Sequence, residues 1–177
     1  HNPSRMSLLN ATIGPLAPEV FHAVIEIPRG STNKYEVDPA TGILKLDRVL
    51  YSPLFYPFDY GYIPQTHYVD GDPLDVLVLC SHPLVPGCMV EAAPIGVMYM
   101  TDDKGSDEKI IAVATKDPRY GYRTRLDQLN EHTLKEVRHF FEVYKQLEEK
   151  AVQIGGFGDR EEAIGLIEKY RVDDRAA

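Results

Sequence analysis

Alternation of apolar and polar residues dominates the first two thirds of the chain and predicts short β-strands rather than helices. Residues 21–27 show the pattern clearly, since Phe21 and Ile25 share one face and Glu26 lies on the other. The strands predicted in this way cover residues 21–27, 34–37, 44–50, 75–80, 89–92, 95–100 and 109–114. They follow one another without intervening helices, which indicates a compact β-barrel rather than a parallel sheet.

A segment rich in tyrosine, proline and glycine interrupts this series at residues 51–68. Pro53, Pro57 and Pro64 are unfavourable inside a sheet because proline donates no backbone hydrogen bond. The tyrosines between them are large enough to pack against the rest of the protein. We therefore predict an ordered, closely packed loop over this segment.

The apolar period changes from 2 to 3.6 residues after Thr133, which predicts a helix. The apolar positions of this helix are Leu134, Val137, Phe140, Phe141, Tyr144 and Leu147. A second helix is predicted over residues 161–170, with Asp159 as its N-cap. The fold class expected from these elements is α+β, mainly β, with the helices at the C-terminal end.

Length and charge narrow the classes of function. The 177 residues fit a single domain over residues 1–177, of which residues 1–5, in front of Met6, resemble an expression-vector remnant. The 27 acidic and 19 basic residues give a formal net charge of −8, which argues against a nucleic-acid partner or an anionic membrane surface. Cys80 and Cys88 are too few for a disulfide scaffold, and we expect a reducing, cytoplasmic location.

Three carboxylates crowd into the segment 70–75, directly before an apolar strand. Asp70, Asp72 and Asp75 repel one another beside a buried strand unless cations neutralise them. Oxygen ligands at this density suit Mg²⁺, Mn²⁺ or Ca²⁺ rather than Zn²⁺. An EF-hand is excluded because Leu74 occupies the fifth position of the loop, where an oxygen ligand is needed. Taken alone, the segment is equally well explained as a solvated acidic turn.

A second acidic loop strengthens the hypothesis of a metal site. Asp102, Asp103 and Asp107 precede the strand that begins at Lys109, and Asp107 and Lys109 should share one face of it. Two acidic loops at the ends of neighbouring strands favour a site for several divalent ions. Basic residues near these strands would then be expected to bind phosphoryl oxygens. The candidates are Lys34, Arg48, Lys109 and Lys145, with hydroxyl groups from Tyr60 and Tyr144.

Six segments, in the same order, resemble the motifs of the soluble family I inorganic pyrophosphatases. They are residues 24–28, 34–38, 46–48, 55–62, 70–78 and 140–145, and the resemblance extends over roughly residues 15–150. It implies an OB-like five-stranded β-barrel with additional strands and two C-terminal helices. It also implies hydrolysis of pyrophosphate to two phosphates by direct attack of metal-activated water. Three to four Mg²⁺ ions per site are expected, with Mn²⁺ or Zn²⁺ as substitutes, and a homohexamer without a nucleic-acid or membrane partner.

The resemblance also assigns roles to individual residues. Asp72 accepts a proton from the attacking water. The metal ligands are Asp70, Asp75, Asp102, Asp107, Glu26 and Glu36, and the residues that bind the phosphates are Lys34, Arg48, Tyr60, Lys109, Tyr144 and Lys145. Of these, Lys34, Arg48 and Tyr60 are expected to take part in catalysis beside Asp72.

Two other functions remain open. An enzyme acting on other phosphoanhydrides, such as tripolyphosphate or nucleoside triphosphates, would use the same chemistry, although no base-stacking pocket is evident in the sequence. An oligonucleotide-binding OB module needs a basic groove with stacking aromatic residues. The acidic composition and the carboxylates of the expected site argue against that module.

Overall fold

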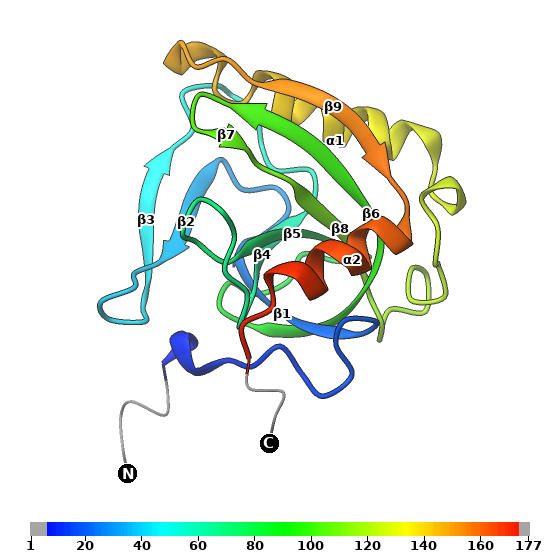
Figure 1. Cartoon of the computed structure of the whole chain (residues 1–177). Coiled ribbons are helices and arrows are strands. Elements are labelled where there is room, and N and C mark those ends of the chain that lie inside the picture. Colours follow the sequence, from blue (N-terminus) through cyan, green and yellow to red (C-terminus); the bar gives the residue numbers. More distant parts are fainter. Residues whose placement is uncertain (1–6, 174–177) are drawn as a thin grey trace.

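Strands make up most of the regular structure that the computed structural model describes between residues 7 and 173 (Figure 1). In chain order they are β1 (Phe21–Ile27), β2 (Asn33–Val37), β3 (Leu44–Val49), β4 (Asp59–Ile63), β5 (Leu74–Leu79), β6 (Met89–Asp102), β7 (Gly105–Ser106), β8 (Lys109–Ala114) and β9 (Gln153–Gly158). The helices are α1 (Glu131–Val143) and α2 (Arg160–Tyr170), with single 3₁₀ turns η2 (Leu8–Asn10), η3 (Leu126–Gln128) and η4 (Gln146–Glu148). The expected vector remnant at residues 1–5 lies outside the described residues.

Five strands close on themselves at the centre of the described structure. β1 pairs with β4, β4 with β5, β5 with β8, β8 with β6, and β6 returns to β1. Within this ring the pairing of β5 with β8 is parallel and the others are antiparallel. The closed ring confirms the predicted five-stranded barrel within an α+β fold.

Additional elements surround the ring. β2 and β3 form a separate two-stranded hairpin, whereas β7 and β9 both extend the sheet from β6. α2 contacts β6, and α1 contacts β9 (Figure 1). Within residues 7–173, no helix has the length and apolar character needed to cross a membrane.

The apolar runs of β5 and β8 supply two separate cores. Alternate side chains of a strand point to opposite faces, so Leu77 and Ile111 join one cluster of buried residues while Val76 and Ile110 join another. The first cluster contains Phe140, Phe141 and other residues of α1, and the second contains Ala163 and Ile167 of α2. A strand covered on both faces explains why its sequence is apolar at nearly every position.

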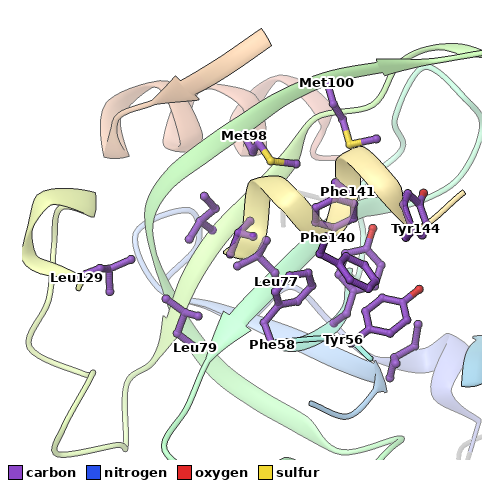
Figure 2. Packing of buried hydrophobic residues seen from close by; sticks show 14 of the residues in the cluster. Tyr56, Phe58, Leu77, Leu79, Met98, Met100, Leu129, Phe140, Phe141 and Tyr144 are labelled. Atoms are coloured by element: carbon purple, nitrogen blue, oxygen red, sulfur yellow. The ribbon is translucent and has the colours of Figure 1, made fainter. Parts of the chain in front are cut away.

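Aromatic rings fill the core beneath α1 (Figure 2). Phe141 stacks on Phe58 with ring centroids 5.5 Å apart, and Phe140 meets Tyr56 at 4.6 Å. Tyr144 follows the last helical residue and stacks on Phe140 at 5.3 Å. This packing fixes the end of α1 against the barrel, and with it the adjacent Lys145.

The prediction of a loop over residues 51–68 is wrong in its second half, where β4 lies buried in the barrel. Pro57 and Pro64 flank the strand rather than interrupt it, so neither removes a hydrogen bond of the ladder. Gly61 stands opposite Ile25 of β1, and a Cβ atom there would lie 1.8 Å from the backbone oxygen of Val24. The glycine permits a close approach of two strands here, although its proline-rich surroundings in the sequence predict a loop.

Three further boundaries differ from the prediction. Residues 89–102 form one strand, not two, because a β-bulge between Pro94 and Gly96 absorbs the irregular sequence. β9 was not predicted, since its three glycines conceal the strand pattern. α1 begins at Glu131, three residues before the first position of the apolar stripe, and ends at Val143, four residues before its last position. The Asp159 cap of α2 is confirmed, because its side chain accepts a hydrogen bond from Glu162 N.

Asp117 anchors the loop that follows β8, which gives a first testable prediction. Its carboxylate accepts hydrogen bonds from Ser81 N at 2.5 Å, Ser81 Oγ at 2.9 Å and Arg119 N at 2.8 Å. Burial alone would raise the pKa of Asp117, but these hydrogen bonds outweigh it and lower the pKa below its ordinary value. Asp117→Asn should therefore cost about 1–3 kcal/mol of unfolding free energy at neutral pH, because an amide presents one oxygen and not two.

The pH dependence of this loss follows from the direction of the shift. A depressed carboxyl pKa stabilises the fold above the unfolded-state pKa of about 3.9, and this contribution disappears as the pH falls below it. The difference between the wild-type protein and Asp117→Asn should shrink in urea unfolding experiments below about pH 4. A difference that is constant from pH 7 to pH 3 would contradict the assignment.

Candidate active site

One pocket of about 680 Å³ gathers almost all of the residues predicted to carry function. Its acidic lining residues are Glu26, Glu36, Asp70, Asp72, Asp75, Asp102 and Asp107. Its predicted phosphate-binding residues are Lys34, Tyr60, Lys109, Tyr144 and Lys145. These side chains come from β1, β2, β4, β5, β6, β8, the loops that precede β5 and β8, and the end of α1, so the fold brings together residues that are far apart in the sequence.

The parallel pairing of β5 with β8 creates the centre of the pocket. Val76 is in register with Ile110, so the preceding residues, Asp75 and Lys109, lie side by side where the two strands begin. Lys109 Nζ donates to Asp75 Oδ2 at 2.7 Å and to Asp107 Oδ1 at 2.9 Å. The predicted shared face of Asp107 and Lys109 is confirmed by this contact.

Lys109 is a buried cation held by charge and by aromatic rings. Its side chain is 3% exposed, and Nζ lies 5.4 Å from the ring centroid of Tyr60 and 5.6 Å from that of Phe141. Burial would lower the pKa of Lys109, but the negative charges of Asp75 and Asp107 raise it well above its ordinary value. Lys109 is therefore charged at neutral pH and balances part of the acidic cluster.

A second ion pair in the pocket joins Lys145, which follows α1, to Asp102 at the end of β6. Lys145 Nζ lies 3.6 Å from Asp102 Oδ2, and both side chains are largely buried. Burial lowers the pKa of Lys145, while Asp102 opposes this shift. The pair places a cation from the end of α1 beside the acidic loop that follows β6.

The first acidic loop turns tightly before β5. Asp72 N donates to Asp70 Oδ1 at 2.9 Å, and Gly71 between them has a φ of 90°, which a residue with a side chain rarely adopts. Burial and the neighbouring charges of Asp70 and Asp75 raise the pKa of Asp72. The loop thus directs several carboxylates toward one pocket.

Glu26 and Glu36 line the pocket from the side of the hairpin. Glu26 Oε2 accepts a hydrogen bond from Val37 N at 2.8 Å, which ties β2 to β1. Burial raises the pKa of Glu26 to about 8, although this hydrogen bond opposes the shift. Glu36 is more exposed and lies 4.0 Å from Lys45 Nζ. Glu26 therefore has a structural role that the sequence did not indicate.

Arg48 is the predicted site residue that the pocket lining does not include. Its Nη1 donates to Glu148 Oε1 at 2.6 Å, and its Nε lies 3.8 Å from Asp47 Oδ2. Glu148 was not among the predicted residues, and its sequence position, three residues after Lys145, carries no signal that would have identified it. Tyr56 was also missed as a lining residue, although it belongs to the aromatic segment that we singled out.

The donor set fits magnesium better than a transition metal. Among residues 7–173, no group of three or more His, Cys, Asp or Glu side chains converges closely enough to enclose a metal ion. Mg²⁺ does not need such a cage, because it keeps several water ligands and is usually held by one or two carboxylates together with substrate phosphates. The acidic side chains of the pocket supply carboxylate oxygens, with no thiol or imidazole among its lining residues. The residues present therefore fit Mg²⁺.

Comparisons with known proteins identify the family of the chain. The family model described as inorganic pyrophosphatase matches residues 23–173. A soluble inorganic pyrophosphatase of Oryza sativa subsp. indica is 52% identical over 161 residues, which cover 91% of this chain and 75% of the rice protein. An inorganic pyrophosphatase of Halalkalibacterium halodurans is 50% identical over 154 residues, covering 87% of this chain and 94% of that protein.

Solved structures resemble the chain in three dimensions as well. The crystal structure of an inorganic pyrophosphatase from Thermus thermophilus superposes with a TM-score of 0.88 at 47% sequence identity, covering 92% of this chain and 95% of that one. An inorganic pyrophosphatase from Helicobacter pylori superposes with a TM-score of 0.86 at 42% identity, covering 91% and 96%. Sequence and fold therefore point to the same group of enzymes.

Proposed function

The chain belongs to the inorganic pyrophosphatase family and is an inorganic pyrophosphatase, and we propose that it hydrolyses pyrophosphate to two phosphates in a Mg²⁺-dependent reaction without a covalent intermediate. One observation carries the proposal, namely that a single pocket contains both a carboxylate cluster and lysines from three separate elements. Carboxylates alone would repel a substrate that is itself an anion. Lysines without carboxylates would bind phosphate but could not hold the metal.

We propose Asp70, Asp75, Asp102 and Asp107 as the principal metal ligands, with Glu26 and Glu36 completing the acidic lining of the same pocket. Mg²⁺ bound there would neutralise phosphate charge and lower the pKa of a water molecule, so that water attacks phosphorus directly. Mn²⁺ or Zn²⁺ would be alternative ions, and three to four ions per site are expected from the family.

Proton transfer is assigned to Asp72. Its position between Asp70 and Asp75 in the sequence, and its place in the pocket lining, bring its carboxylate close to the proposed metal ligands. A carboxylate that accepts a proton while its neighbours bind metal lets one short loop perform both tasks. No Ser, Cys or His nucleophile is needed for this reaction.

The phosphates would be bound by cations from three separate elements of the fold. Lys34 comes from the β2–β3 hairpin, Lys109 from β8 and Lys145 from the end of α1. Tyr60 and Tyr144 line the same space, and burial is the main cause that raises the pKa of each hydroxyl. Each tyrosine is therefore protonated at neutral pH and able to donate a hydrogen bond to a phosphate oxygen.

An assay of phosphate release tests the proposal. The purified protein should release phosphate from pyrophosphate in the presence of Mg²⁺, lose this activity on addition of a chelator, and recover it with excess Mg²⁺. ATP, measured in parallel, should be cleaved far more slowly, which separates this enzyme from a broad phosphoanhydride hydrolase. Release that is indifferent to the chelator, or ATP cleavage as fast as that of pyrophosphate, would contradict the proposal.

Assembly and location belong to the same proposal. The family resemblance predicts a homohexamer, which light scattering would detect as a mass about six times the 20.0 kDa of one chain. A cytoplasmic location is predicted from the low cysteine content. A monomer or dimer in solution would contradict the hexamer without affecting the proposed chemistry.

A further inference from the structure

We infer that Glu148 is a positioning residue, which orients Arg48 so that its guanidinium binds a phosphate of the substrate. The inference rests on the proposed function and deepens it, because Arg48 was assigned to the phosphates from sequence but does not line the pocket. Arg48 contacts Glu148, and four features of this pair and its surroundings support the role.

The first feature is the position of Arg48 on the hairpin. Arg48 in β3 is in register with Lys34 in β2, so the two side chains leave the hairpin on the same face. Lys34 lines the pocket from that face. Arg48 is therefore one strand away from a predicted phosphate-binding lysine and directed to the same side of the hairpin.

The second feature is the position of Glu148 in η4, which follows α1. η4 begins at Gln146, directly after the pocket residue Lys145, and ends at Glu148. The ion pair between Arg48 and Glu148 thus joins the hairpin wall, which carries Lys34, to the α1 wall, which carries Lys145. It therefore sets the distance between two sets of cations that are proposed to bind the same substrate.

The third feature is burial. Arg48 Nη1 and Glu148 Oε1 are 2.6 Å apart, and the side chains are 24% and 6% exposed. A pair removed from water in this way holds its geometry, whereas exposed ion pairs exchange freely with solvent. By comparison, Arg138 and Glu142 on the outer face of α1 make a similar contact at 2.7 Å but are 47% and 39% exposed.

The fourth feature is an unused donor. Arg48 Nε is buried and finds no hydrogen-bond partner within the described part of the chain, and Asp47 Oδ2 at 3.8 Å is too far to provide one. A buried donor without a partner costs free energy that an arriving acceptor recovers. With Nη1 fixed by Glu148, Nε and the second guanidinium nitrogen form the fork that binds two oxygens of a phosphate.

These features predict a change in substrate affinity rather than in the chemical step. Glu148→Ala should raise the KM for pyrophosphate about tenfold and leave kcat within about threefold, because a misoriented guanidinium weakens binding of the substrate and the transition state alike. Glu148→Gln keeps an oxygen in the place of Oε1 and should restore most of the affinity. Glu142→Ala, which removes the exposed pair on the same helix, should change neither parameter.

A double-mutant cycle shows whether Glu148 acts through Arg48. In an Arg48→Ala background, Glu148→Ala should have no further effect on KM, since there is no guanidinium left to orient. Equal effects with and without Arg48 would overturn the inference, as would a Glu148→Ala enzyme with unchanged KM or a Glu148→Gln enzyme as weak as Glu148→Ala. Thermal unfolding of each variant separates a loss of orientation from a loss of fold.

The proposed function is tested separately by the wild-type enzyme in the same assay. If the wild type cleaves pyrophosphate with Mg²⁺ while Glu148→Ala is unaffected, the inference fails and the proposed function stands. If the wild type does not cleave pyrophosphate, the proposed function itself fails.

Discussion

Replacing Asp75 by asparagine is expected to lower the turnover number at least about 100-fold while the protein stays folded. Asp75 lines the pocket and forms an ion pair with Lys109, and its side chain is 30% exposed. Asparagine has nearly the same volume but lacks the negative charge needed to bind a metal ion. The effect should therefore appear in turnover at saturating pyrophosphate.

The fold should survive this substitution because Lys109 keeps a second partner. Asp107 Oδ1 remains 2.9 Å from Lys109 Nζ, so the buried ammonium is not left unpaired. Steady-state kinetics at several Mg²⁺ concentrations would measure the loss, with thermal unfolding as the check on folding. Asp127→Asn, which removes an exposed carboxylate paired with Arg125 at 2.9 Å, is the matched control and should leave turnover unchanged. Normal turnover in Asp75→Asn would show that Asp75 is not a metal ligand.

Replacing Lys109 by methionine should destabilise the protein by about 3–5 kcal/mol when Mg²⁺ is scarce. Methionine fills most of the volume of the lysine stem, but it leaves Asp75 and Asp107 facing each other without the cation that now lies 2.7 and 2.9 Å from them. Mg²⁺ should restore part of the lost stability, because a bound cation neutralises the same two carboxylates. Urea unfolding with chelator and with excess Mg²⁺ would measure both effects.

The control for this prediction is a lysine in an exposed ion pair. Lys135 lies 3.7 Å from Glu131 on α1, and both side chains are well exposed to solvent. Lys135→Met should change the unfolding free energy by at most about 0.5 kcal/mol, independent of Mg²⁺. If Lys109→Met were as mild as Lys135→Met, or if its loss did not respond to Mg²⁺, the central role of Lys109 in charge balance would be refuted.

Much of the fold was accessible from the sequence because the strands of a half-buried sheet alternate. β1, β3, β5 and β8 were located nearly to the residue, and the stripe that includes Phe140 and Phe141 identified α1. The errors in the predicted secondary structure occur where a residue type, such as glycine, is compatible with both a loop and a strand. Gly61 and its flanking prolines looked like turn residues, but the close approach of β1 and β4 requires glycine within a strand.

Most residues that line the candidate site were also predicted, because they belong to short sequence motifs that can be recognised without knowledge of the fold. What the sequence could not provide was the partner of each charge. Lys109 was predicted as a phosphate-binding residue from the sequence, but its two buried carboxylate partners, Asp75 and Asp107, became visible only in the structure. Arg48 was expected in the pocket, but it pairs with Glu148, 100 residues later in the chain.

The sequence by itself therefore determined the mainly β architecture, the C-terminal helices and the set of acidic and basic residues from which the site is built. These depend on local periodicity and on motifs that lie within a few residues of one another. The tertiary structure alone decided which strands close the barrel and which charges meet. Such pairings join positions far apart in the chain, and only the register of β5 with β8 and the packing of α1 bring them within hydrogen-bonding distance.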